Sequence, residues 1–145
     1  MTDICSKALD FIDISVKLSQ NLTKPDVIAL KELAWGRHED EYWQSMQGQF
    51  DLILASDVVY LPECVDPLIE SVKFFLKPGT GKCLMVNAFV RCEAFLGQLS
   101  QKCDSLGINL AYDPDIEEDP TDKSKRFKVS LMTVASQKMT KTTSD

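Results

Sequence analysis

The sequence predicts an α/β fold, built on a largely parallel sheet, from two observations. Short apolar runs alternate along the chain with longer segments in which apolar residues recur at helical spacing. The runs at residues 51–56 and 82–90 are also almost continuously apolar, which is typical of strands covered on both faces. Strands that alternate with helices pair in parallel through right-handed connections. The 145 residues are enough for one domain with a hydrophobic core.

The first part of the chain predicts a helix, a strand and a loop before the first long apolar run. A helix is expected over residues 6–22, where apolar residues recur at three- and four-residue intervals, and Pro25 disfavours its continuation. The partly β-branched run at residues 27–33 predicts a strand. Residues 34–49 are polar and mixed, and we expect a loop there with one helical turn.

The middle of the chain predicts a helix, a strand and a second helix. Asp66 is expected to be the N-cap of the first of these helices, with Pro67 at its first helical position. A strand follows over residues 82–90. Apolar residues at helical spacing then predict a helix over residues 92–106, which Gly107 ends.

The last part of the chain predicts two strands with no helix between them. These are residues 108–112 and 126–134, and they are expected to pair as an antiparallel hairpin. The acidic segment at residues 113–125 is expected to be the solvated loop between them. Residues 136–145 are polar, and we expect a disordered tail. With no internal repeat, residues 1–135 are predicted to form a single domain.

Composition and charge exclude several classes of protein. The net charge of −6 argues against a nucleic-acid binder that neutralises phosphates. No apolar stretch is long enough to cross a bilayer, and the start of the chain lacks the pattern of a secretory signal. The five cysteines form no CxxC pair, so free thiols in a reducing compartment are expected, three of them in the core. The expected location is the cytoplasm, with the nucleus as the alternative.

Chemically useful side chains follow the predicted strands. In open α/β sheets, ligands bind outside the carboxyl ends of the strands. A carboxylate there can bind both ribose hydroxyls, an indole can cover an adenine, and a small residue lets a cofactor approach the strand. The residues at these positions are Asp3, Trp35, Gly36, Ser56, Asp57, Tyr60 and Asn87. Simpler roles stay open for three of them: Asp57 can cap the following segment, Asp3 can be a helix N-cap, and Trp35 can be a core aromatic. His38 is expected in a solvated loop, and the sequence has no second histidine with which it could share a metal.

The segments "KELAWG" and "FDLILASDVVYLPECVDPLIESV" resemble the seven-β-strand, S-adenosylmethionine-dependent protein methyltransferases of the lysine-methylating type. The resemblance covers roughly residues 1–135. It implies that Asp3 binds the ribose hydroxyls and that Trp35 lies against the adenine. It also implies that Ser56 contacts the cofactor, while Asp57 orients the target amine and Tyr60 lines its channel.

The resemblance implies a Rossmann-like methyltransferase sheet, S-adenosylmethionine as cofactor, and methyl transfer to a protein lysine. The implied partner is a protein substrate, with no nucleic acid and no membrane. A catalytically inactive methyltransferase remnant that binds a protein partner is the alternative from another class. The sequence does not indicate an oligomeric state.

The chain departs from the family at its beginning. Relatives carry a first strand that ends in a glycine-rich loop, and this loop lets the backbone approach the cofactor. None of the six glycines forms such a loop. We therefore expect a sheet without its first strand, in which the two neighbouring strands each lose a pairing partner. Met1 falls where relatives end their second strand, so a truncated chain is expected.

Overall fold

The computed structural model describes most of the chain, in two compact units, Met1–Arg37 and His38–Asp145. The described residues are 1–19, 28–112 and 127–134. The acidic segment and the polar tail predicted at the end of the chain lie outside these ranges, and a single domain over residues 1–135 stays a prediction. No helix in the described ranges is both long enough and apolar enough to span a membrane.

The first unit contains a short parallel strand pair and one helix. The elements are β1 (Thr2–Asp3), α1 (Ser6–Leu18) and β2 (Lys31–Glu32). The predicted first helix is confirmed from its first residue to Leu18. The predicted strand over residues 27–33 shrinks to β2, because β1 offers only two residues as partners, Thr2 opposite Lys31 and Asp3 opposite Glu32. A strand gains hydrogen bonds only as far as its neighbour extends.

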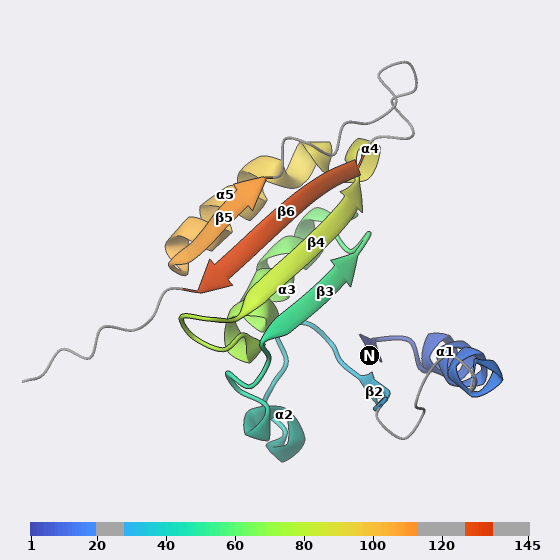
Figure 1. The fold of residues 1–145 in the computed structure, drawn as a ribbon. Coiled ribbons are helices and arrows are strands. Elements are labelled where there is room, and N and C mark those ends of the chain that lie inside the picture. Colours follow the sequence, from blue (N-terminus) through green and yellow to red (C-terminus); the bar gives the residue numbers. More distant parts are fainter. Residues whose placement is uncertain (20–27, 113–126, 135–145) are drawn as a thin grey trace, which may run out of the picture. The chain divides into compact units, whose positions relative to one another are not determined.

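The second unit is built on a four-stranded sheet (Figure 1). Its strands are β3 (Leu52–Ser56), β4 (Lys82–Ala88), β5 (Ile108–Tyr112) and β6 (Phe127–Val134). Their order is β3-β4-β6-β5; β3 and β4 are parallel, and β6 is antiparallel to both of its neighbours. This arrangement confirms the predicted mixture of parallel strands and a terminal antiparallel hairpin.

Helices accompany the sheet in the order that the sequence predicts. They are α2 (Glu41–Ser45), α3 (Pro62–Phe75), α4 (Phe89–Cys92), the 3-10 helix η2 (Glu93–Phe95) and α5 (Leu96–Ser105). The helical turn predicted in residues 34–49 is α2. Gly107 follows α5 with a φ of 67°, a left-handed conformation that favours glycine, and so ends the helix as predicted.

The core lies between the sheet and the two longer helices of this unit. Figure 1 shows α3 and α5 on one face of the sheet. The buried side chains on that face of the sheet include Cys83, Met85, Ser130 and Met132, and those of the helices include Ile69, Val72, Leu99 and Cys103. Burial raises the pKa of the Cys83 thiol to about 12 and that of Cys103 to about 11. These thiols stay protonated and serve as small apolar groups, as expected.

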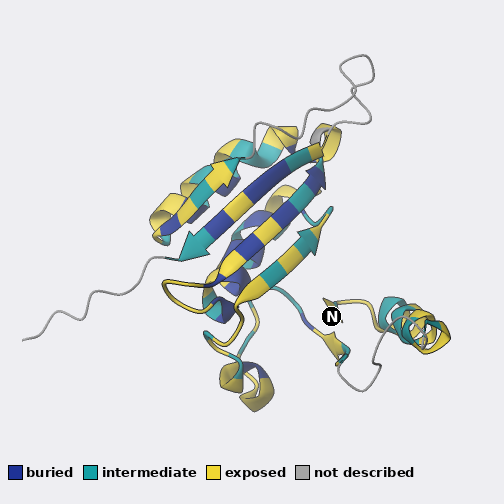
Figure 2. Ribbon diagram, viewed as in Figure 1, coloured by how far each residue is buried: buried dark blue, intermediate teal, exposed yellow. Residues whose placement is uncertain are grey.

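The opposite face of the sheet is more exposed than the sequence predicts. Burial alternates along β3 and β4 (Figure 2). Leu54 is 70% exposed, and it continues a row across the sheet with Leu84 and Leu131, which are 37% and 38% exposed. The prediction that both runs are covered on both faces is therefore wrong for this unit. The cause is that α3 and α5, the two longer helices of this unit, both lie on the other face of the sheet (Figure 1).

Helix α3 begins five residues before the predicted start. Its N-cap is Leu61 and Pro62 is its first residue, where the fixed φ of proline fits and no backbone N–H is needed. Pro67 lies inside the helix. Asp66 accepts a hydrogen bond from Gln98 instead of capping α3. The sequence contains two prolines five residues apart, and the structure shows that the earlier one starts the helix.

His38 packs against α3 and does not lie in a solvated loop. Its ring stacks on Phe74 with centroids 4.4 Å apart, and its Nε2 lies 2.9 Å from the Ser71 hydroxyl oxygen. The Ser71 hydroxyl donates to the Pro67 carbonyl, so the histidine Nε2–H is the donor in the other bond. Burial lowers the pKa of His38, although Glu39 and Glu70 act in the opposite direction.

This packing predicts a pH dependence of stability. Because the pKa of His38 is lower in the folded chain than its usual value of 6.5, protonation favours the unfolded chain. The stabilisation is complete above pH 6.5 and is lost as the pH falls through the folded pKa. Urea unfolding of wild type and His38→Gln between pH 5.5 and 7.5 measures it, since His38 is the sole histidine. Equal pH slopes in the two proteins would contradict the assignment.

Candidate functional site

The backbone turns sharply at Asp57, the first residue after β3. Asp57 has a φ of 54°, in the left-handed region that aspartate and asparagine enter more readily than most residues. Its N–H donates to the Val86 carbonyl at 2.7 Å, which extends the pairing of β3 with β4 by one residue. Its carboxylate lies at the carboxyl end of β4, where Oδ1 accepts from the Ala88 N–H at 3.2 Å and Oδ2 pairs with Arg91.

The next two residues are held by a buried amide. Asn87 is 3% exposed, and its Oδ1 accepts from the backbone N–H groups of Val58 at 2.9 Å and Val59 at 3.0 Å. Val59 is itself 1% exposed and anchors the segment in the core. The segment from residue 57 to 61, here called the β3–α3 loop, is therefore bound to β4 at three consecutive residues. Tyr60 follows these anchors and is 48% exposed.

This unit thus brings three predicted site residues together at one end of the sheet. Ser56 is the last residue of β3 and is exposed, and Asp57 and Tyr60 lie in the loop that follows it. The sequence interpretation named Asn87 but gave it no role, and it missed Arg91. The available signal for Arg91 was its place one turn beyond the end of β4.

Two further residues at the same end of the sheet were not predicted. Lys128 lies opposite Asn87 in the β4–β6 register, and its Nζ is 4.3 Å from the centre of the Tyr112 ring. The Tyr112 hydroxyl is buried and has no hydrogen-bond partner in the part of the chain that the structure describes. Burial raises the pKa of Tyr112, so the phenol stays neutral.

The other predicted residues belong to the first unit, at one end of the β1–β2 pair. Asp3 ends β1, and its Oδ1 accepts from the Cys5 N–H at 2.8 Å. The N-cap of α1 is Cys5, so Asp3 is not the cap itself. Trp35 is half-buried and comes three residues after Glu32, which pairs with Asp3. Gly36 has a φ of 77° in the turn that Arg37 closes onto Ala34, and glycine is favoured in that position.

The residues present fit part of S-adenosylmethionine. A carboxylate and an indole at the same end of a parallel strand pair suit a ribose and an adenine, and they lie in the first unit. The glycine-rich loop expected against the methionine portion has no counterpart among the six glycines of the sequence. The fit is therefore to the adenosine portion. Across residues 1–19, 28–112 and 127–134, no group of three or more His, Cys, Asp or Glu side chains could hold a metal ion.

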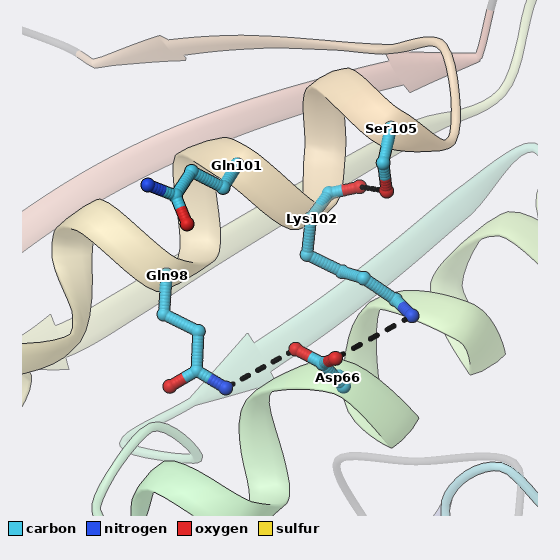
Figure 3. Close-up of a pocket in the computed structure, with 5 residues that line it drawn as sticks. All are labelled: Asp66, Gln98, Gln101, Lys102 and Ser105. Carbon is cyan, nitrogen blue, oxygen red and sulfur yellow. Dashed lines mark hydrogen bonds and ion pairs between the residues drawn. The ribbon is translucent and has the colours of Figure 1, made fainter.

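A hollow between α3 and α5 is lined by residues that pair with one another. Its lining residues are Asp66, Gln98, Gln101, Lys102 and Ser105 (Figure 3). The Lys102 ammonium pairs with Glu70 at 2.5 Å and lies 3.6 Å from Asp66, whose other oxygen accepts from Gln98 at 3.1 Å. The hydrogen bond to Glu70 and the charge of both acids raise the pKa of Lys102. The charged side chains at this hollow therefore pair with one another and connect α3 to α5.

The Asn87 contacts predict a loss of stability on substitution. Asn87→Leu removes the acceptor of two backbone N–H groups, one of them buried, and should lower the free energy of unfolding by about 2 kcal/mol. Asn109→Leu is the matched control, because Asn109 is exposed on β5 and its replacement should change stability by less than about 0.5 kcal/mol. Urea unfolding of both variants measures the difference; equal losses would contradict the role given to Asn87.

Comparison with known proteins places this geometry in a family. The family model described as lysine methyltransferase matches residues 1–101. Protein N-lysine methyltransferase METTL21A of Danio rerio is 31% identical over 96 residues, which are 66% of this chain and 43% of that protein. Protein-lysine N-methyltransferase EFM3 of Saccharomyces cerevisiae is 27% identical over 123 residues, 81% of this chain and 34% of that protein. The chain therefore matches less than half the length of either curated relative.

Solved structures agree on the fold. The CurJ carbon methyltransferase has a TM-score of 0.62 at 14% identity, over 93% of this chain and 41% of that one. The methyltransferase domain of bacterial CtHen1-C also has a TM-score of 0.62, at 12% identity, over 93% of this chain and 76% of that one. At such identities the likeness concerns the fold. The predicted Rossmann-like methyltransferase sheet is thus confirmed, and the chain belongs to the lysine methyltransferase family.

Proposed function

We propose that this chain transfers a methyl group from S-adenosylmethionine to the side-chain amine of a lysine in a protein substrate. The observation that carries the proposal is the arrangement of Asp57 and Tyr60. They lie in a loop bound to β4 at the carboxyl end of the sheet, in a chain of the lysine methyltransferase family. The names of the two curated relatives, both protein-lysine methyltransferases, support the substrate class.

Asp57 and Tyr60 have complementary tasks in this proposal. The Asp57 carboxylate attracts the lysine cation and orients the amine, which must lose a proton before it can act as a nucleophile. The Tyr60 ring is half-exposed, so it can line the approach of the lysine and contact a methylated ammonium through its face. Bound S-adenosylmethionine would supply the methyl group as an activated sulfonium.

Three residues are proposed for cofactor binding. Asp3 would bind the ribose hydroxyls and Trp35 would contact the adenine, in keeping with their place at the same end of the β1–β2 pair. Ser56 would contact the cofactor from the end of β3, where its side chain is small and exposed. The proposed location is the cytoplasm, with the nucleus as the alternative. The five free cysteines support a reducing compartment.

Methyl transfer to lysine tests the proposal directly. The protein is incubated with S-adenosylmethionine labelled in its methyl group and a mixture of lysine-containing peptides, and mass spectrometry locates the label. The expected result is label on lysine ε-amines and none in the same mixture after lysine acetylation. Calorimetry of cofactor binding accompanies it. The absence of both cofactor binding and label would overturn the proposal and leave the inactive, protein-binding alternative. Cofactor binding with label on another side chain would overturn the substrate class.

A further inference from the structure

We propose that Arg91 occupies the place on the Asp57 carboxylate that the substrate lysine takes, so that the two cations compete for the site. The inference rests on the proposed function, because it assigns a lysine to Asp57. It begins with the two oxygens of that carboxylate. Oδ1 accepts from the Ala88 N–H at 3.2 Å, and Oδ2 pairs with Nη1 of Arg91. The oxygen that is not bound to backbone is the one that contacts a cation.

Arg91 is not needed to position Asp57. The Asp57 N–H donates to the Val86 carbonyl, and the following residue is held by Asn87. Together with the bond from Ala88, these contacts fix both the backbone and the carboxylate from β4. Because they all persist without Arg91, removal of the guanidinium should leave the acid in place and free Oδ2 for another cation.

The pair is also easy to separate. The Arg91 side chain is 58% exposed and that of Asp57 is 36% exposed. Ion pairs at such positions stabilise proteins little, because water solvates the separated charges. Arg91 stands on the single-turn helix α4, next to Cys92, which is 1% exposed and anchors the turn. The long arginine side chain can therefore leave the carboxylate while its backbone stays in place.

An arginine suits this role chemically. Its guanidinium stays protonated at any physiological pH, so it binds a carboxylate but offers no neutral amine for methylation. A lysine here would present the very group that the proposed reaction modifies. The neighbouring cation, Lys128, lies over the ring of Tyr112. In the described residues, Arg91 is the side chain that forms an ion pair with Asp57.

Binding of n-butylammonium, which is a lysine side chain without its backbone, tests the competition apart from catalysis. Its dissociation constant is measured from the NMR shifts of the Asp57 carboxylate in wild type and Arg91→Gln, with butan-1-ol as the neutral probe. We expect Arg91→Gln to bind the cation two- to fivefold more tightly, the range that a weak exposed pair supports. Lys77→Gln is the matched control: it removes an exposed cation paired with Asp51 beside the other end of β3, and should change nothing.

Kinetics add a second readout. Arg91→Gln should lower the KM for a lysine peptide two- to fivefold and leave kcat unchanged. A fall in kcat, or no tightening of n-butylammonium binding, would overturn the inference, as would an absence of binding to both proteins. Tighter binding without methyl transfer by either protein would overturn the proposed function and leave the competition standing. Methyl transfer with unaltered KM and binding would overturn the competition alone.

Discussion

Asp57→Asn is expected to lower the rate of methyl transfer to lysine at least about 100-fold, with little change in stability. The substitution removes the charge that attracts and orients the amine. It keeps the backbone, because asparagine also tolerates the φ of 54° at this position. It also keeps an oxygen for the Ala88 N–H. Alanine would be a poorer choice, since a strained backbone and a missing carboxylate would then act together.

Initial rates at saturating S-adenosylmethionine, together with urea unfolding, measure the Asp57 effect. The matched control is Asp51→Asn, which removes an exposed carboxylate just before the opposite end of β3. We expect the control to retain the wild-type rate. A rate for Asp57→Asn within threefold of wild type would show that the carboxylate does not take part.

Gly81→Ala is expected to lower the free energy of unfolding by about 3 kcal/mol. A Cβ at this position would lie 2.7 Å from both N and O of Lys77 and 2.9 Å from the Phe50 carbonyl oxygen. All three are backbone atoms. The Lys77 and Phe50 backbones are hydrogen-bonded to each other at 2.9 Å, and Gly81 itself donates to Lys77 at 2.8 Å. Relief of the clash would therefore break the connection that leads from α3 into β4.

Gly97→Ala is the matched control for Gly81→Ala. Gly97 lies in α5, and a Cβ there would meet nothing within 4 Å. Alanine is favoured over glycine by about 0.5–1 kcal/mol in a helix interior, so this variant, at the second residue of α5, should be slightly more stable than wild type. Urea unfolding of the two variants should give opposite signs. A destabilisation of similar size in both would show that close packing at Gly81 is not the cause.

The strands of the second unit could be predicted to within two residues, because each is a short apolar run between turn residues. The start of α3 could not. Asp66-Pro67 is a strong local signal for a helix start, yet the helix starts five residues earlier at Leu61-Pro62, which offers proline at the first position but no capping side chain. The extra turn lets Val65, which is fully buried, reach the core. Tertiary packing thus favoured the weaker of two local signals.

The candidate site also has a part that could be predicted from the sequence and a part that could not. Asp57 and Tyr60 could be predicted because they directly follow an apolar run. The neighbours of Asp57 could not, since they depend on pairing between distant segments. Arg91 reaches the carboxylate because β3 lies beside β4. Lys128 comes to that end of the sheet because β6 runs antiparallel to β4, with Lys128 opposite Asn87. No local pattern contains that register.

The left-handed backbone at Asp57 also limits how this position can change over time. A φ of 54° strains alanine, valine and most other residues, whereas asparagine and glycine adopt it at little cost. A descendant that had lost selection for the charge would therefore be expected to carry asparagine or glycine here. The same geometry makes such a loss reversible by a single substitution, because the loop that presents the acid would still be folded around its place.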